Sequence, residues 1–177
     1  MVMLVHLIMK MAPYGVGALL FKVAGTTGPS VLLALGAYAL VVLAGLAIHL
    51  VFTYGLVIRF AVKLPFFGFL GAIREAILVA FSTSSSSATL PVTMQCVEEK
   101  VGVGKEVSSF VLPLGGTVNM DGTALYQGVA AIFIAQIYGM DLGLAEQATI
   151  VGSATLASVG AAGVPGAGMI TLAMVLT

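Results

Sequence analysis

Long stretches of this 177-residue chain carry no charge, and this feature constrains the fold most. No Asp, Glu, Lys or Arg lies within residues 23–58 or 147–177, and Asp121 is alone within 107–140. About 20 apolar residues suffice for a helix to cross the ~30 Å hydrocarbon layer of a bilayer. Charged residues make up 8% of the chain, against ~25% in soluble domains. We therefore expect an all-α polytopic membrane protein, and we exclude soluble, disordered, fibrous and disulfide-rich secreted classes.

The charge balance and the single cysteine exclude several other classes. Seven basic and seven acidic residues cancel, and no basic face of the kind that binds nucleic acid is visible, so no nucleic-acid partner is predicted. Cys96 is alone, which excludes an internal disulfide and a Cys-based zinc site. His6 and His49 belong to no motif, and we expect both to be packed or interfacial. No cofactor is predicted, because VGVGK is followed by Glu106 and not by the Ser or Thr of a phosphate-binding loop.

Two apolar segments predict two membrane spans. Residues 1–25 form the first span, with a kink at Pro13. Residues 31–58 form a second, long span that must tilt or project from the bilayer, and Arg59, Lys63 and Pro65 are expected to end it. The sequence is still apolar at its last residues, so we expect it to be a portion of a longer chain.

The remaining segments predict interrupted helices. Residues 67–97 consist of a short helix, the polar run TSSSSATLP and a second arm after Pro91, and the charged turn EEKVGVGKE follows them, which is typical of a re-entrant hairpin. Residues 107–138 are long enough to cross the bilayer, but NMDG interrupts them. Residues 148–177 predict a second re-entrant hairpin, broken by SVGAAGVPGAG and truncated at the end of the chain.

Loop charges orient the two predicted hairpins. The loops that flank the first hairpin carry basic residues, whereas the loop before the second carries none: Arg59, Lys63, Lys100 and Lys105, against only Asp141 and Glu146. The positive-inside rule then places the entry of the first hairpin at the cytoplasm and that of the second outside. Two interrupted hairpins that enter from opposite sides indicate an inverted repeat, whose tips meet near the midplane where secondary transporters bind substrate.

The serine run predicts a carboxylate site. Ser84 to Ser87 and Thr89 place hydroxyls and free amides beside the N-terminus of a half-helix, which favours an anion. A serine-rich surface linker is the alternative. A serine hydrolase would need a positioned base for one of these serines, and no motif places either histidine there.

Asp121 is the sharpest single signal in the sequence. A carboxylate in an apolar tract costs roughly 2.5–3.5 kcal/mol on insertion scales and needs compensation. Thr117, Asn119 and the carbonyls freed at the break form an all-oxygen set with Asp121, which favours a hard cation. A proton is the competing ligand, and a plain helix cap is the structural alternative.

The segment SVGAAGVPGAG, which interrupts the second predicted hairpin, consists mostly of residues with small side chains or none. Four glycines, Gly160, Gly163, Gly166 and Gly168, would let the backbone approach a ligand or move as a gate. A tight helix contact through small residues is the alternative interpretation.

Three segments resemble one known family. TSSSSATLPVTM, LPLGGTVNMDGTALYQG and ASVGAAGVPGAGMITLAMVL are similar to segments of the dicarboxylate/amino acid:cation symporters, the sodium- or proton-coupled glutamate and aspartate symporters. The resemblance implies an elevator mechanism and a homotrimer in the full-length protein. It assigns residues 1–25 to a scaffold and 26–177 to a partial transport domain.

The resemblance also implies two sets of binding residues. The substrate would contact the serine tip, the broken helix and the glycine-rich tip: Ser84, Ser85, Ser86, Met120, Thr123, Val164, Pro165, Gly166, Ala167 and Gly168. The coupling cations, sodium or protons, would bind Gly115, Thr117, Asn119, Met120, Asp121, Ser158, Val159 and Ala161. Ala161 replaces the Thr of some relatives, and Ser84 replaces the Arg of some archaeal relatives.

The sequence thus predicts a multi-pass plasma-membrane symporter of acidic amino acids that catalyses no bond chemistry. A C4-dicarboxylate symporter is the alternative within transport, because the span that reads the amino group in the family is not part of this sequence. An intramembrane serine hydrolase and an inert structural subunit are the alternatives from other classes.

Overall fold

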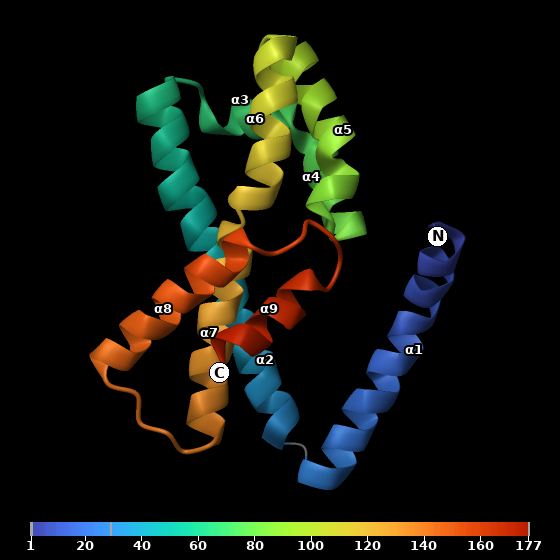
Figure 1. The fold of residues 1–177 in the computed structure, drawn as a ribbon, viewed down its shortest axis with the longest axis vertical. Coiled ribbons are helices and arrows are strands. Elements are labelled where there is room, and N and C mark those ends of the chain that lie inside the picture. Colours follow the sequence, from blue (N-terminus) through green and yellow to red (C-terminus); the bar gives the residue numbers. More distant parts are fainter. Residues whose placement is uncertain (1, 29, 177) are drawn as a thin grey trace. The chain divides into compact units, whose positions relative to one another are not determined.

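The computed structural model describes residues 2–28 and 30–176, and the elements within these residues are all helices, with no strand (Figure 1). They form two compact units, Met1–Val41 and Val42–Thr177. The division falls inside a helix, whereas the predicted division at residue 25 separates scaffold from transport domain. That functional division stays a prediction.

The smaller unit contains α1 (Val2–Thr27) and the start of α2 (Ser30–Ile48). Helix α1 continues through Pro13 and ends where Gly28 takes a positive φ of 87° and donates its N–H to the carbonyl of Ala24 at 3.0 Å. Glycine adopts this left-handed conformation at little steric cost, which explains why the helix ends within GTTGPS.

Helix α2 continues into two π-helical segments, η1 (His49–Tyr54) and η2 (Val57–Val62). Together they form one helical stretch, Ser30–Val62, that is long and apolar enough to cross a membrane. The predicted span, residues 31–58, stops four residues too early, because Arg59 lies inside η2. The helix ends at Lys63, which has φ 59° and lies two residues before Pro65.

Four short helices follow the span: α3 (Phe66–Ala72), α4 (Arg74–Thr83), α5 (Ser86–Cys96) and η3 (Val97–Val101). Helices α3 and α4 meet at an angle of 63°. Helices α4 and α5 lie side by side and are joined by a break at residues 84–85 (Figure 1). The expectation that the second arm begins at Pro91 is wrong, because Ser85 already starts the helix as its N-cap.

Helices α6 (Lys105–Val118) and α7 (Asp121–Ile137) flank the NMDG interruption. The break that the sequence predicts is present, but it is narrower than predicted. Only Asn119 and Met120 lie outside the helices, because Asp121 and Gly122 already belong to the first turn of α7.

The last two helices are α8 (Leu144–Val159) and α9 (Ala167–Val175), separated by the glycine-rich segment 160–166. Helix α8 begins four residues before the predicted start at residue 148. Glu146 Oε2 accepts the N–H of Gly143 at 2.6 Å, so the acidic residue that suggested a loop instead caps the helix.

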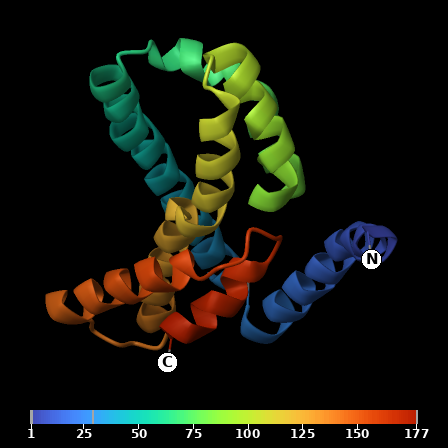
Figure 2. The same ribbon diagram turned by 45° about the horizontal axis from the view of Figure 1, so that its top comes forward.

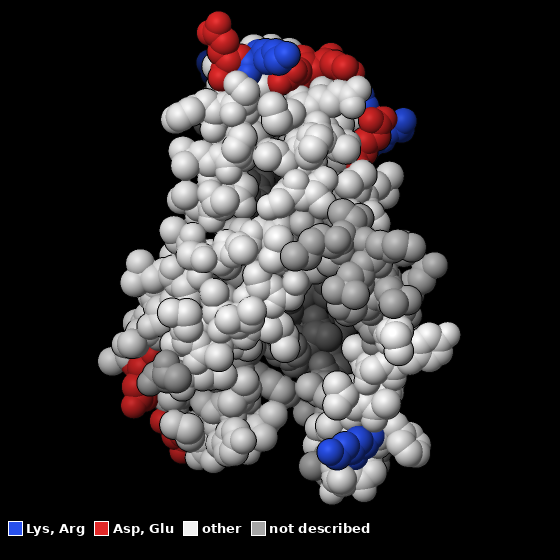
Figure 3. Space-filling view, turned by 45° about the vertical axis from the view of Figure 1, so that its right-hand side comes forward, with Lys and Arg blue, Asp and Glu red and all other residues white. Residues whose placement is uncertain are grey.

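In the last part of the larger unit, α8 and α9 pack against α7 (Figure 2). Small side chains form much of this interior, which allows the helices to approach closely: Ala130, Ala131, Ala135 and Ala154 are all buried. Figure 3 shows charged side chains at the ends of this unit and a wide face without charge between them, as a bilayer requires.

Candidate functional site

Two helix breaks that lie far apart in the sequence meet in the larger unit. The Ser85 hydroxyl donates a hydrogen bond to the carbonyl of Gly163 at 2.7 Å, and the N–H of Ser87 donates to the same carbonyl at 3.0 Å. One glycine carbonyl therefore joins the serine-rich break to the glycine-rich break. The pairs α4–α5 and α8–α9 reach this contact from opposite ends of the unit (Figures 1 and 2).

The serine break is held by its own side chains. Ser84 ends α4 in a left-handed conformation, with φ 50°, which costs a non-glycine residue about 1–2 kcal/mol. Ser85 is buried, and its hydroxyl accepts the N–H of Ala88 at 3.1 Å as the N-cap of α5. Pro91 has no N–H to donate to the carbonyl of Ser87, so that carbonyl lacks its usual helical donor.

The glycine break has no room for side chains at two positions. A Cβ on Gly163 would lie 2.8 Å from the hydroxyl of Ser87. A Cβ on Gly168 would lie 3.0 Å from Cε1 of Tyr126 and closer still to its hydroxyl. Gly166 has φ 81° and forms the N-cap of α9, a conformation that glycine adopts readily.

A cavity of about 200 Å³ lies between the two breaks. Its wall contains seven of the ten residues that were predicted to contact substrate: Ser84, Ser86, Met120, Thr123, Val164, Gly166 and Gly168. Three others, Ser85, Pro165 and Ala167, are not part of this wall. Ser85 instead joins the two breaks.

Three helices begin at this cavity. Ser86 is the first residue of α5, Thr123 lies in the first turn of α7, and Gly168 lies in the first turn of α9. Helix N-termini present unpaired N–H groups and the positive end of the helix dipole, and both favour an anion. The cavity therefore combines hydroxyls with three anion-favouring helix ends.

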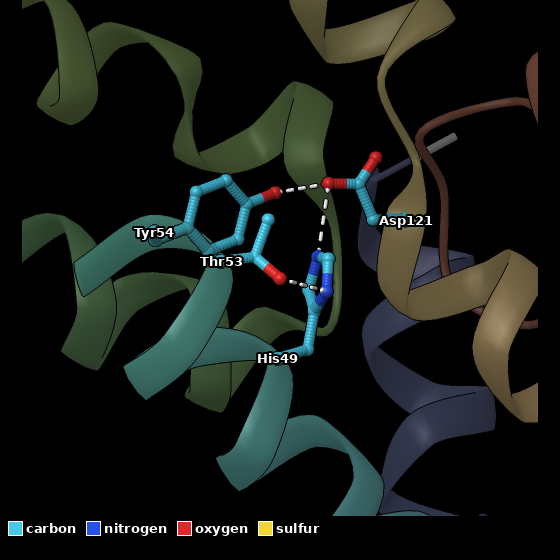
Figure 4. A network of polar contacts seen from close by, with 4 residues as sticks. All are labelled: His49, Thr53, Tyr54 and Asp121. Atoms are coloured by element: carbon cyan, nitrogen blue, oxygen red, sulfur yellow. Dashed lines mark hydrogen bonds and ion pairs between the residues drawn. The ribbon is translucent and has the colours of Figure 1, made fainter. Parts of the chain in front are cut away.

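Asp121 does not cap α7, because Met120 is the N-cap residue and Asp121 is the first residue of the helix. Its carboxylate instead faces the span (Figure 4). Oδ2 accepts the hydroxyl of Tyr54 and lies 3.3 Å from Nε2 of His49. The side chains of Asp121 and His49 are about a third exposed, at 33% and 29%. A neighbouring span thus supplies the compensation that the sequence predicted this carboxylate to need.

The residues predicted to bind cations lie in two groups. Gly115, Thr117, Asn119, Met120 and Asp121 lie at the α6–α7 break, whereas Ser158 and Val159 end α8 and Ala161 follows in the glycine-rich segment. Thr117 and Ser158 donate their hydroxyls to helix carbonyls, those of Leu114 and Thr155. Their oxygens can still accept a cation, because a hydroxyl that donates keeps its lone pairs. Apart from the Met120 thioether these donors are oxygens, which fit sodium.

The sequence interpretation missed four residues of this region: His49, Tyr54, Tyr126 and Gln127. Gln127 is fully buried, its Nε2 donates to the carbonyl of Gly168 at 2.9 Å and to Thr171, and its Oε1 has no partner in the described part of the chain. The available signal in the sequence was a polar residue within an otherwise apolar helical tract, the glutamine of ALYQG.

Comparisons with known proteins identify the family of this chain. The model of the sodium:dicarboxylate symporter family matches residues 1–177. The chain is 47% identical to excitatory amino acid transporter 3 of Oryctolagus cuniculus, over 98% of this chain and 33% of that protein. It is 50% identical to an excitatory amino acid transporter of Caenorhabditis elegans, over 81% of this chain and 28% of that protein. The chain spans about a third of the length of the curated relatives it matches.

Proposed function

Because this chain belongs to the sodium:dicarboxylate symporter family, we propose that it forms the substrate-binding part of a secondary transporter for acidic amino acids. Sodium ions drive the transport, and no bond chemistry is catalysed. The relatives' names, excitatory amino acid transporters, support this substrate class.

The cavity between the two helix breaks carries the proposal. Its wall offers the hydroxyls of Ser84, Ser86 and Thr123 together with the starts of three helices. A carboxylate accepts hydrogen bonds from hydroxyls and from helix N-termini, and such charge-assisted bonds are the stronger ones. An acidic amino acid therefore finds donors for a carboxylate at this cavity.

Asp121 and the cation supply the coupling. An ionised carboxylate without a partner is costly in an apolar setting, so Asp121 favours binding of a cation. The bound cation adds positive charge near the anionic substrate. In this proposal Gly115, Thr117, Asn119, Met120 and Asp121 contribute to cation binding, and Ser158, Val159 and Ala161 contribute carbonyls from the glycine-rich hairpin.

The arrangement in the membrane is part of the same proposal. The pairs α4–α5 and α8–α9 act as re-entrant hairpins of an inverted repeat, residues 26–177 move as a partial transport domain, and residues 1–25 belong to a scaffold. The full-length protein is a homotrimer in the plasma membrane and works as an elevator. The Gly163 contact supports the hairpin arrangement, since two breaks joined at their tips can share one ligand.

Uptake of labelled glutamate or aspartate into vesicles tests this function. Full-length protein is reconstituted, and sodium and proton gradients are imposed separately. We expect uptake under the sodium gradient and a loss of at least about tenfold in Asp121→Asn, a change of about 1.4 kcal/mol or more. Asp141→Asn is the matched control, because Asp141 is exposed in a loop, and it should transport like the wild type.

Three outcomes would contradict parts of the proposal. Full ion-driven uptake in Asp121→Asn would remove Asp121 from the cation site. Uptake driven by protons alone would replace sodium as the coupling ion. Transport of labelled succinate in preference to glutamate and aspartate would establish the C4-dicarboxylate alternative.

A further inference from the structure

We propose that His49 and Tyr54 are positioning residues that fix the carboxylate of Asp121 for the coupling cation. The inference rests on the proposed sodium-coupled function and adds residues of the apolar span to it. Both side chains contact the same carboxylate oxygen, Oδ2 (Figure 4). The other oxygen, Oδ1, points away from them.

The π-helical turn of the span brings these two side chains together. His49 and Tyr54 are five residues apart, and in an α-helix five residues rotate by about 500°, which places them on different faces. A π-helix pairs residues i and i+5, so the two positions share one face. Their rings pack edge to face with centroids 5.0 Å apart, and both reach Asp121.

Thr53 completes the arrangement at the other ring nitrogen of His49. Its hydroxyl lies 3.1 Å from Nδ1 of His49. When the hydroxyl donates to Nδ1, the neutral ring carries its proton on Nε2, the atom that faces Asp121. Tyr54 and His49 then both donate to Oδ2.

As a consequence, Oδ2 of Asp121 is held by two hydrogen bonds, and Oδ1 is left to bind the cation. Two donors from one helix turn prevent free rotation of the Asp121 side chain, so Oδ1 keeps its direction before any cation arrives. A ligand that is already oriented loses less conformational freedom on binding, and the affinity for the cation rises accordingly.

Sodium binding to the purified full-length protein tests the inference without transport. The sodium concentration that gives half of the maximal thermal stabilisation is measured in the absence of substrate. Tyr54→Phe removes only the hydroxyl, and we expect it to raise this concentration about three- to tenfold. Thr53→Val should raise it less. Tyr138→Phe is the matched control, because Tyr138 is exposed at the end of α7, and it should leave the concentration unchanged.

A purely structural role would lower the melting temperature without sodium and leave the sodium midpoint in place, which would overturn the inference. An unchanged or lower midpoint in Tyr54→Phe would overturn it as well. The substrate KM at saturating sodium should stay within about twofold of wild type, since Tyr54 does not line the cavity. A wild-type protein that shows no response to sodium would overturn the proposed function and this inference together, whereas a normal wild type with an unshifted variant overturns the inference alone.

Discussion

The serine-rich break between α4 and α5 presents side-chain hydroxyls, whereas the glycine-rich break between α8 and α9 presents backbone. In the first, the Ser85 hydroxyl caps helix α5 and also donates a hydrogen bond to the carbonyl of Gly163 in the other break. In the second, Gly163 offers a carbonyl, and the missing side chains of Gly163 and Gly168 leave room for Ser87 and Tyr126. One side of the contact is fixed by hydrogen bonds, and the other depends on close approach. Substitutions should therefore act differently on the two sides: removing the Ser85 hydroxyl damages the serine break, and adding atoms damages the glycine break.

The largest effect is expected from Gly168→Ala, which adds one methyl group to the glycine break. The new Cβ would overlap the ring of Tyr126, and overpacking of this kind costs about 1–3 kcal/mol. We expect a lower melting temperature in detergent and a loss of most uptake. Gly160→Ala is the matched control, because a Cβ there meets only the carbonyl of Ala157 at 3.8 Å. Equal behaviour of the two variants would show that the glycine break does not depend on close approach.

Ser85→Ala should come next, because it removes atoms from the serine break. The variant loses the cap on Ala88 and one of the two donors to Gly163. Loss of a helix N-cap costs about 1 kcal/mol, and the melting temperature should fall accordingly. Ser82→Ala is the control, since the exposed Ser82 hydroxyl donates to a carbonyl in its own helix. A fall of the same size in the control would mean that the Gly163 contact contributes nothing.

Ser84→Gly separates stability from binding. Glycine relieves the left-handed backbone at φ 50°, so stability should rise by up to about 1 kcal/mol. The lost hydroxyl lines the cavity, so the substrate KM should rise. Lys63→Gly is the control: it has the same backbone conformation, with φ 59°, outside the cavity. It should gain stability with an unchanged KM, and a raised KM in this control would contradict the assignment of Ser84.

The smallest effect is expected outside both breaks. Lys100 and Glu75 form an ion pair of 2.8 Å, with both side chains largely in contact with solvent. The hydrogen bond from Lys100 to Glu75 raises the pKa of Lys100 above its usual value of 10.5. The same bond lowers the pKa of Glu75. The stabilisation is thus present at neutral pH and is lost as the pH rises through the raised pKa of Lys100 or falls through the lowered pKa of Glu75. Exposed pairs contribute little, so Lys100→Gln should match the wild type in melting temperature and uptake at neutral pH. A clear loss would show that this end of the molecule is coupled to the breaks.

The sequence was sufficient to predict the helical class and the places where helices break. Uncharged tracts identify membrane helices because charges are costly in hydrocarbon, and glycine and serine runs mark the breaks because they interrupt helical hydrogen bonding. The family predicted from three motifs is confirmed by the match over residues 1–177. The boundaries were less accurate, since Glu146 looked like a loop residue and is part of a helix start.

The contacts of His49 and Tyr54 could not be predicted from the sequence. Their approach to Asp121 depends on a π-helical turn, and no residue pattern in HLVFTY announces one. With α-helical spacing the two side chains would lie on different faces, and His49 was accordingly expected to be packed or interfacial. The partner of Ser85 was equally hidden, because Gly163 is 78 residues away in the sequence.

The shared carbonyl of Gly163 ties both hydrogen bonds between the two breaks to one atom. Its donors, the Ser85 hydroxyl and the Ser87 amide, lie two residues apart at the start of one helix, so a displacement of the glycine segment stretches both bonds. The Ser85 hydroxyl and the Ser87 amide then face the gap together and need a new acceptor. In the transport proposed above, a carboxylate oxygen of the substrate would be an acceptor of the kind that this place requires.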